Sequence, residues 1–283
     1  MKKVFTACMT LAIALGFGLN AEAQTIKTPA PSPLSTVKQA FGLSDVTVEY
    51  SRPSAKGRTV FGDVVPFDAL WRTGANSSTK ITFGDDVKID GKAVPAGTYS
   101  LFSIPGKTEW TIILNKNTKL GGTNGYSEAE DALRFKAKVR TKADKTETFT
   151  IDFANLSANK ATLELIWENT VVAFDFSTEF DDKVMKNIES VMAKDARPYH
   201  QAASYYYDNK KDLNKALEWA NKAVEANPEA YWSLLLKAKI QLELKDYKGA
   251  IATAEKVKVV GKDDAAHVKM ANEVIAAANK GGK

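Results

Sequence analysis

The stretch "LRFKAKVR", from Leu133 to Arg140, alternates apolar and basic side chains at every second position. This period is typical of a β-strand with one buried and one solvated face, because successive side chains of a strand point to opposite faces. The same alternation occurs in Val46–Tyr50 and in Phe149–Phe153. The middle of the chain is therefore predicted to consist of half-buried strands.

Further strands are expected where apolar residues alternate in Trp110–Leu114, Leu163–Trp167 and Val172–Phe176. Turn-forming pairs separate these runs, namely Asp90-Gly91, Pro105-Gly106 and Glu168-Asn169. About nine or ten short strands without a helical pattern between them favour an antiparallel sandwich or jelly roll. We expect this β-sandwich domain to span residues 45–179.

A helical period replaces the alternation after residue 180. In "DLNKALEWANKAVEA", residues 212–226, small and apolar side chains recur three and four positions apart. Ala216 and Ala220 are followed 34 residues later by Ala250 and Ala254. Small residues at this period resemble the tetratricopeptide repeat, in which paired helices approach closely. We therefore expect an α+β chain whose residues 180–283 form an all-α helical-repeat domain, with a generic helical bundle as the alternative.

The resemblance to the repeat family has two departures. Gln241 stands where the first repeat has Tyr207, and Lys262 stands where it has Pro228. The resemblance implies a concave face that holds a peptide or a protein partner. Packing against the β domain is the alternative use of this face. The residues implied for it are Gln201, Tyr205, Asp208, Trp232 and Lys239.

The N-terminal residues predict export. Lys2 and Lys3 precede an apolar run, and Ala21-Glu22-Ala23 fits a cleavage site, so residues 1–23 are expected to be a signal peptide cleaved near Ala23. The product would be periplasmic or extracellular. The proline-rich "TPAPSPLS" indicates an extended linker over residues 24–44. No later apolar run is long enough to span a membrane.

The charge and the rarity of histidine exclude several classes of function. The formal net charge is +5, and basic and acidic residues are mixed along the chain, so we expect no nucleic-acid partner. The single cysteine, Cys8, lies in the predicted signal peptide, and His200 and His267 are the only histidines. No metal site, cofactor or catalytic triad is expected from this set.

Arginine is concentrated in one segment. Three of the six arginines, Arg52, Arg58 and Arg72, lie within 21 residues, close to Asn76. Arginine is favoured over lysine where a planar fork must meet a carboxylate or stack on a ring. In one interpretation these arginines pair with Asp63, Asp68 or Asp85 and hold an irregular loop. In the other, Arg52, Arg58, Arg72 and Asn76 bind an anionic ligand such as a carboxylate or an acidic sugar.

The same segment carries a resemblance to a known family. "VTVEYSRPSAKGR", "FGDVVPFDALWRTGAN" and "DGKAVPAGTYSLFSIPGKTEWTIILN" look like the bacterial family labelled domain of unknown function 2911, over about residues 31–177. The resemblance implies an exported β domain, often followed by helical repeats, and brings no established activity. A glutamate often follows the Gly-Ala-Asn run in that family, whereas this chain has Ser77.

Two functions remain open at this point. The main hypothesis is a non-enzymatic binding or scaffold protein of the cell envelope, with a small anionic or carbohydrate ligand on the β domain. The alternative is a polysaccharide hydrolase with a carboxylate pair on the β domain. Asp63, Asp85 and Glu109 are available, but no spacing singles out a pair. Trp71 and Trp110 could stack on sugars, although core packing is the commoner use of tryptophan.

Overall fold

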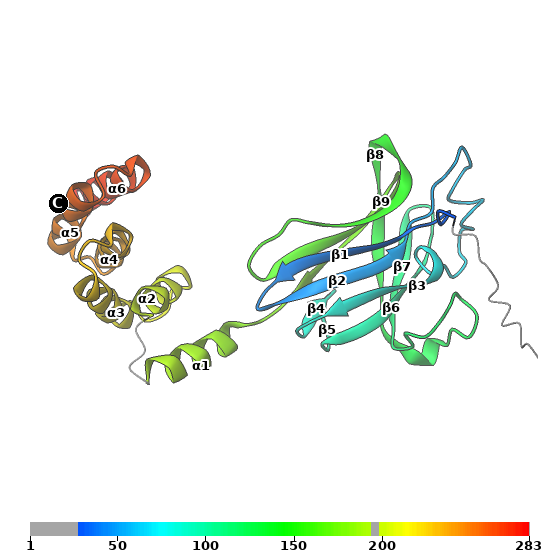
Figure 1. Ribbon diagram of the computed structural model, residues 1–283, viewed down its shortest axis with the longest axis horizontal. Helices are drawn as coiled ribbons and strands as arrows, with labels where there is room; N and C mark the ends of the chain where they lie inside the picture. The colour runs from blue at the N-terminus through cyan, green and yellow to red at the C-terminus, as the bar shows by residue number, and fades with distance from the viewer. Residues whose placement is uncertain (1–27, 194–197, 283) are drawn as a thin grey trace, which may run out of the picture. The chain divides into compact units, whose positions relative to one another are not determined.

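A computed structural model describes residues 28–193 and 198–282 of the chain. The chain divides into two compact units, Met1–Thr178 and Glu179–Lys283, which we call the β unit and the helical unit (Figure 1). The predicted signal peptide and its cleavage site lie outside the described residues. Within the described ranges, no helix combines the length and the apolar character needed to cross a membrane.

The β unit is a large antiparallel sheet of nine strands in the described residues (Figure 1). Neighbouring strands follow the order β1-β2-β3-β6-β7-β8-β9-β4-β5, and a short 3-10 helix, η1 (Glu128–Glu130), precedes β8. The strands are β1 (Leu34–Phe41), β2 (Ser44–Ser51), β3 (Ala75–Phe83), β4 (Val87–Ile89), β5 (Lys92–Val94), β6 (Gly97–Ile104), β7 (Glu109–Asn115), β8 (Asp131–Ala154) and β9 (Lys160–Ser177).

Strand β1 lies inside the segment that the sequence analysis assigned to a linker. Residues 34–41 pair with β2 along their whole length, from Leu34 opposite Ser51 to Phe41 opposite Ser44, so the linker prediction was wrong for them. β1 is an edge strand, and only Val37 and Phe41 place apolar side chains against the core. Its alternation is therefore too weak to be read beside the preceding prolines.

Strands β8 and β9 are longer than the separate runs predicted for them. The Glu168-Asn169 pair is not a turn between strands. Glu168 lies within β9 with φ 50°, where the register with β8 shifts between Thr141 and Thr150. Such irregularities bend a strand pair. Before the shift β8 pairs with β7 and then with β9, and after it β8 pairs with β9 and forms an isolated bridge from Thr148 to Ser54. The Asp90-Gly91 turn does join β4 to β5, with positive φ at both residues.

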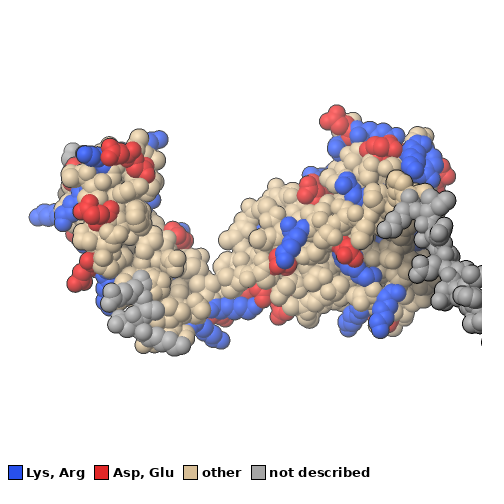
Figure 2. All heavy atoms as spheres, in the orientation of Figure 1, with Lys and Arg blue, Asp and Glu red and all other residues tan. Residues whose placement is uncertain are grey.

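The core of the β unit contains a cluster of aromatic rings. Trp71, Trp110 and Trp167 contact one another or Phe61 with ring centroids 5.0–6.2 Å apart. Phe41 of β1 contacts Phe176 of β9 at 4.8 Å, so strands from distant places in the sheet order share this core. Acidic and basic side chains are interspersed on the visible surface (Figure 2).

The helical unit contains six helices in the described residues, and the apolar side chains form two clusters. Ala216, Ala220, Ala250 and Ala254, the alanines related by the 34-residue spacing, are fully buried. The helices are α1 (Asp181–Met192), α2 (Tyr199–Asp208), α3 (Leu213–Ala226), α4 (Tyr231–Glu243), α5 (Tyr247–Val260) and α6 (Ala265–Gly281).

Aspartates cap the second helix of each predicted pair. Asp212 accepts the backbone N–H groups of Asn214 and Lys215 at the start of α3, and Asp246 accepts that of Gly249 at the start of α5. An N-terminal cap of this kind satisfies donors that have no partner inside the helix. Gln241, one of the departures from the repeat pattern, is buried and donates to Asp246 Oδ2 at 2.9 Å.

Candidate functional site

Arg52 and Arg58 hold together the first part of the connection between β2 and β3, residues 52–60, which we call the arginine loop. Arg52 donates from Nε to the carbonyl of Phe149 at 3.0 Å and from Nη2 to Thr150 Oγ1 at 2.7 Å. Arg58 donates to the carbonyl oxygens of Ala55 and Ser54, at 2.9 and 3.1 Å. Both guanidinium groups therefore bond to oxygens of the protein itself, Arg52 to those of β8 and the exposed Arg58 to those of its own loop.

The expected aspartate partners are not used. In the part of the chain that the structure describes, none of the three arginines pairs with Asp63, Asp68 or Asp85. Charge-assisted hydrogen bonds to carbonyl and hydroxyl oxygens take the place of those ion pairs. The prediction that the arginines hold an irregular loop remains compatible with Arg52 and Arg58, but its aspartate pairing was wrong.

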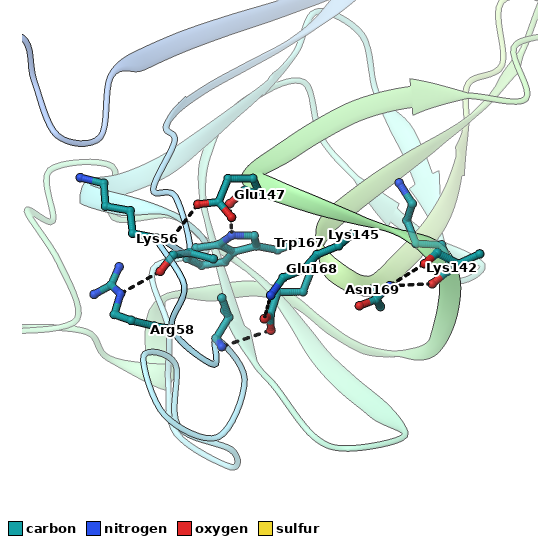
Figure 3. Close-up of polar contacts among 11 residues, drawn as sticks. Lys56, Arg58, Lys142, Lys145, Glu147, Trp167, Glu168 and Asn169 are labelled. Carbon is teal, nitrogen blue, oxygen red and sulfur yellow. Dashed lines mark hydrogen bonds and ion pairs between the residues drawn. The ribbon is translucent and has the colours of Figure 1, made fainter.

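Two glutamates complete the attachment of this loop (Figure 3). Glu147 accepts the backbone N–H of Lys56 at 2.6 Å. Glu168 accepts the backbone N–H of Val60 at 3.1 Å and the Nζ of Lys145 at 3.1 Å. Sequence reasoning missed both residues. Glu168 makes its contact with Val60 where the backbone of β9 is irregular. In the sequence, only the turn-like Glu168-Asn169 pair marked this position.

The segment Trp71–Asn76 has an unusual backbone. Thr73, Gly74 and Asn76 have φ angles of 51°, 154° and 57°. A Cβ on Gly74 would lie 3.0 Å from Thr79 Oγ1 and 3.1 Å from the carbonyl oxygen of Ser51, so the strand packing leaves room only for glycine. Left-handed residues that are not glycine carry strain, and such strain gathers at ligand clamps and active sites.

Buried hydrogen bonds fix this segment in place. The indole N–H of Trp71 donates to the carbonyl of Gly74 at 3.0 Å, and Thr79 Oγ1 donates to the carbonyl of Thr73 at 2.6 Å. Thr73 is fully buried and bonds through its hydroxyl to Ser103 at 2.9 Å. The backbone that carries Arg72 is thus held from both sides.

Arg72 is partly exposed and makes few contacts. Within the described residues its guanidinium makes one hydrogen bond, from Nη1 to the carbonyl of Asn76 at 2.7 Å. Its plane lies against Gly122, where an added Cβ would be 3.3 Å from both Cζ and Nη1. A guanidinium has five N–H donors, so most of those of Arg72 remain available.

Asn76 and Ser77 follow Arg72 at the start of β3. The Asn76 amide donates to Ser51 Oγ at 3.1 Å and to the carbonyl of Ser32 at 3.3 Å. Asn76 therefore ties β3 to the residues around β1 and β2, and it presents its carbonyl oxygen to Arg72. Ser77 is exposed. The structure brings Arg72 and Asn76 together, whereas Arg52 and Arg58 lie in the arginine loop earlier in the same connection.

Two buried serines, Ser78 and Ser100, anchor the glycine-rich loop, residues 117–125, which contains Gly122. Ser78 donates to the carbonyl of Leu120 at 3.0 Å, and Ser100 donates to that of Asn117 at 2.8 Å. Lys80 donates to Ser78 Oγ at 2.8 Å. Burial lowers the pKa of Lys80, and the charge of Glu49 opposes that shift. These contacts hold residues 117–120 against β3 and β6. The sequence did not predict them.

The residues considered for a carbohydrate hydrolase do not lie together in a shared site. Trp71 and Trp110 are buried in the aromatic cluster, so neither ring is free to stack on a sugar. Glu109 lies at the start of β7 with its carboxylate 3.8 Å from Lys136. Asp63 and Asp85 lie in two separate turns. Both tryptophans therefore have the commoner use, core packing, and not the alternative of stacking on a sugar.

The predicted peptide-binding residues of the helical unit lie in several environments. Gln201 and Tyr205 line a hollow of about 250 Å³ whose opposite wall is α1. The Tyr205 hydroxyl donates to Asp181 of α1 at 2.7 Å; burial and this carboxylate raise the pKa of Tyr205. Helix α1 therefore occupies the predicted face at Tyr205, whereas Gln201 is exposed.

The other three residues do not share that hollow. Asp208 accepts the hydroxyl of Ser204 at 3.0 Å and borders a second hollow with Tyr207 and Glu243. Trp232 is 45% exposed, and Lys239 Nζ lies 3.9 Å from the sulfur of Met270. As a binding surface, these residues remain a prediction.

Both histidines have protein partners. His200 Nδ1 lies 3.0 Å from Ser233 Oγ, and burial lowers the pKa of His200. His267 Nδ1 lies 2.9 Å from Asp264 Oδ2 at the start of α6. Among residues 28–193 and 198–282, no group of three or more histidine, cysteine, aspartate or glutamate side chains is arranged to hold a metal ion.

Comparison with known proteins gives one match. The model of the family described as "Protein of unknown function (DUF2911)" matches residues 32–176, which is half of the chain and nearly all of the described β unit. No curated protein and no solved structure matches the chain. The matched residues include the arginine loop, the segment Trp71–Asn76 and the glycine-rich loop, and the chain therefore belongs to the DUF2911 family.

Proposed function

We propose that this protein is an exported, non-enzymatic binding protein of the cell envelope. Its β unit binds a small anionic ligand, a carboxylate or an acidic sugar, and its helical unit contacts a protein or peptide partner. The spare hydrogen-bonding capacity of Arg72, on a backbone held rigidly in a strained conformation, carries the proposal. Export follows from the signal peptide expected over residues 1–23.

Arg72 suits the recognition of a carboxylate for three reasons. Its guanidinium is fixed by the bond to Asn76 and by the flat contact with Gly122, so little side-chain entropy is lost on binding. It has unused donors on a planar fork that matches two carboxylate oxygens. Its carbonyl and glycine neighbours carry no negative charge that would compete with the ligand.

The arginine loop has a supporting role in this proposal. Arg52 and Arg58 each form two hydrogen bonds to oxygens of the protein. We therefore reduce the proposed ligand-binding set from the four predicted residues to Arg72 and Asn76, with Ser77 and Gly122 at the border. The hydrolase has no comparable support, because its candidates Asp63 and Asp85 lie in two separate turns and the Glu109 carboxylate lies 3.8 Å from Lys136.

Two finer assignments of fold belong to the same proposal. The contacts of Phe41 with Phe176 and of Tyr50 with Phe149 support a sandwich in which β1–β3 face β8 and β9 across the aromatic core. The burial of the four alanines at 34-residue spacing supports tetratricopeptide-like repeats. In this interpretation the exposed Trp232 is available to a partner.

Calorimetric titration of the full chain tests the ligand. The probe is glucuronate, with glucose as its neutral counterpart. We expect glucuronate to bind and glucose not to bind. Arg72→Ala should abolish binding, and Arg72→Lys should weaken it about 10-fold or more, because a single ammonium cannot form the bidentate contact.

Arg58→Lys is the matched control, since it alters an arginine of the same family segment whose bonds are internal. It should leave the affinity for glucuronate unchanged. Equal loss of binding in Arg58→Lys and Arg72→Lys would show that the effect is structural and would contradict the proposal, as would a wild-type protein that binds neither sugar.

A further inference from the structure

The two edges of the β sheet differ in length and protection. β5 forms one edge with three residues, of which Lys92 is charged. β1 forms the other edge with eight residues, "LSTVKQAF", and in the described part of the chain it pairs with β2 alone. A long edge strand presents a row of backbone donors and acceptors that can pair with another chain, and proteins usually block such an edge.

β1 carries few of the usual blocking features. It contains no proline and a single charged residue, Lys38, and its register with β2 runs without a bulge from Leu34 to Phe41. Leu34 is 65% exposed at one end. The edge is therefore regular, extended and nearly uncharged, which favours strand addition.

The hydrogen bonds of β1 to β2 define which groups point outward. The N–H of Arg52 donates to the carbonyl of Pro33 at 2.9 Å, so the odd-numbered residues of β1 face β2. In an antiparallel ladder the alternate residues direct both backbone groups to the other side. The outward residues are Leu34, Thr36, Lys38 and Ala40, and their side chains are also exposed.

We infer that β1 is a self-association edge, on which a second copy of this chain adds its own β1 in antiparallel orientation. A two-fold axis through Val37 places Thr36 opposite the partner's Lys38 and Leu34 opposite the partner's Ala40. The apolar Leu34 side chain is then covered, and the outward N–H and C=O groups of the four residues pair across the interface. The carbonyl of Ala40, which accepts the Gln39 side-chain amide at 3.0 Å in the single chain, can accept the second hydrogen bond as well. The interface is isologous, as two-fold symmetry requires.

Charge selects this register over its neighbour. An axis through Lys38 would place this lysine opposite the same residue of the partner, and like charges directly opposite one another are destabilising. Lys38 is bonded to Asp45 at 2.9 Å within its own subunit, but its side chain remains 64% exposed. The register centred on Val37 keeps the two Lys38 side chains apart. In this register residues 34–40 of each copy lie opposite residues 40–34 of the other, and Phe41 lies outside the pairing.

Position 36 gives a test that separates pairing from stability. Thr36 lies opposite Glu49 in the ladder within one subunit. Thr36→Lys therefore adds an attractive pair inside the subunit but a repulsive pair with the partner's Lys38. Thr36→Glu does the reverse. If β1 pairs with itself, the more stable variant will form the weaker dimer.

Sedimentation equilibrium of the full chain measures the dissociation constant of the dimer. We expect a dimer for the wild type. Since two such pairs form per dimer, Thr36→Glu should tighten and Thr36→Lys weaken the dimer by about 2- to 30-fold each. Adding Lys38→Glu to Thr36→Lys should restore association. A protein that stays monomeric at every accessible concentration overturns the inference, and equal dissociation constants for the two variants overturn it as well.

Discussion

Arg52 and Arg72 belong to the same family segment and differ in what they contact. Arg52 bonds to Phe149 and Thr150 of a strand about 100 positions away, so it links two parts of the chain. Arg72 bonds to a carbonyl four positions along the sequence and lies on a glycine. Arginines of one enriched segment therefore have two different structural roles. One guanidinium holds the fold, and the other is itself held by the fold.

The largest effect on stability is expected from Arg52→Ala. The change removes two charge-assisted hydrogen bonds and leaves the Phe149 carbonyl without this donor, which should lower the free energy of unfolding of the β unit by about 3 kcal/mol. Urea unfolding followed by tryptophan fluorescence measures it, since Trp71, Trp110 and Trp167 all report on this core. A loss below about 1 kcal/mol would remove Arg52 from its structural role.

A somewhat smaller effect is expected from Gly74→Ala. The new methyl group would press on Thr79 Oγ1 and on the Ser51 carbonyl, and the backbone conformation disfavours alanine, so we expect a loss of about 2 kcal/mol. Gly121→Ala is the matched control, because a Cβ there meets no atom within 4 Å. The same urea titration applies. If both variants are equally stable, the rigidity claimed for the segment Trp71–Asn76 is not real.

The smallest effect on stability is expected from Arg72→Ala. Only one hydrogen bond is lost and the site is partly exposed, so the free energy of unfolding should fall by about 1 kcal/mol or less. Differential scanning calorimetry beside Arg52→Ala gives the comparison directly. A loss as large as that of Arg52→Ala would make both arginines structural and would remove the distinction on which the proposed ligand site depends.

Local patterns were sufficient for the elements with strong alternation. The strand containing Leu133–Arg140 and the Asp90-Gly91 hairpin lie where the sequence predicts them, because one face is buried throughout and the turn needs residues that accept positive φ. β1 was missed because an edge strand buries little. The continuity of β9 through Glu168 was missed because a bulge uses the same residue types as a turn.

The candidate site shows the same limit. The sequence singled out Arg72 and Asn76, and they do contact each other. It also offered Arg52 and Arg58 with equal weight, and it did not include Ser78 or Lys80, which anchor the loop that carries Gly122. Partners such as Arg52 and Phe149 are far apart in the chain, so no spacing rule connects them.

Periodicity along the chain was enough to predict the class of each unit, since the change from period two to a helical period near residue 180 dictates which backbone can bury its apolar side chains. The sequence also determined that the arginine segment is special. Long-range contacts in the folded chain settled which arginine bonds to a distant strand and which bonds only within its own segment. The reason is physical: a guanidinium takes whatever oxygens folding brings within about 3 Å of it, and for Arg52 those oxygens come from a distant strand.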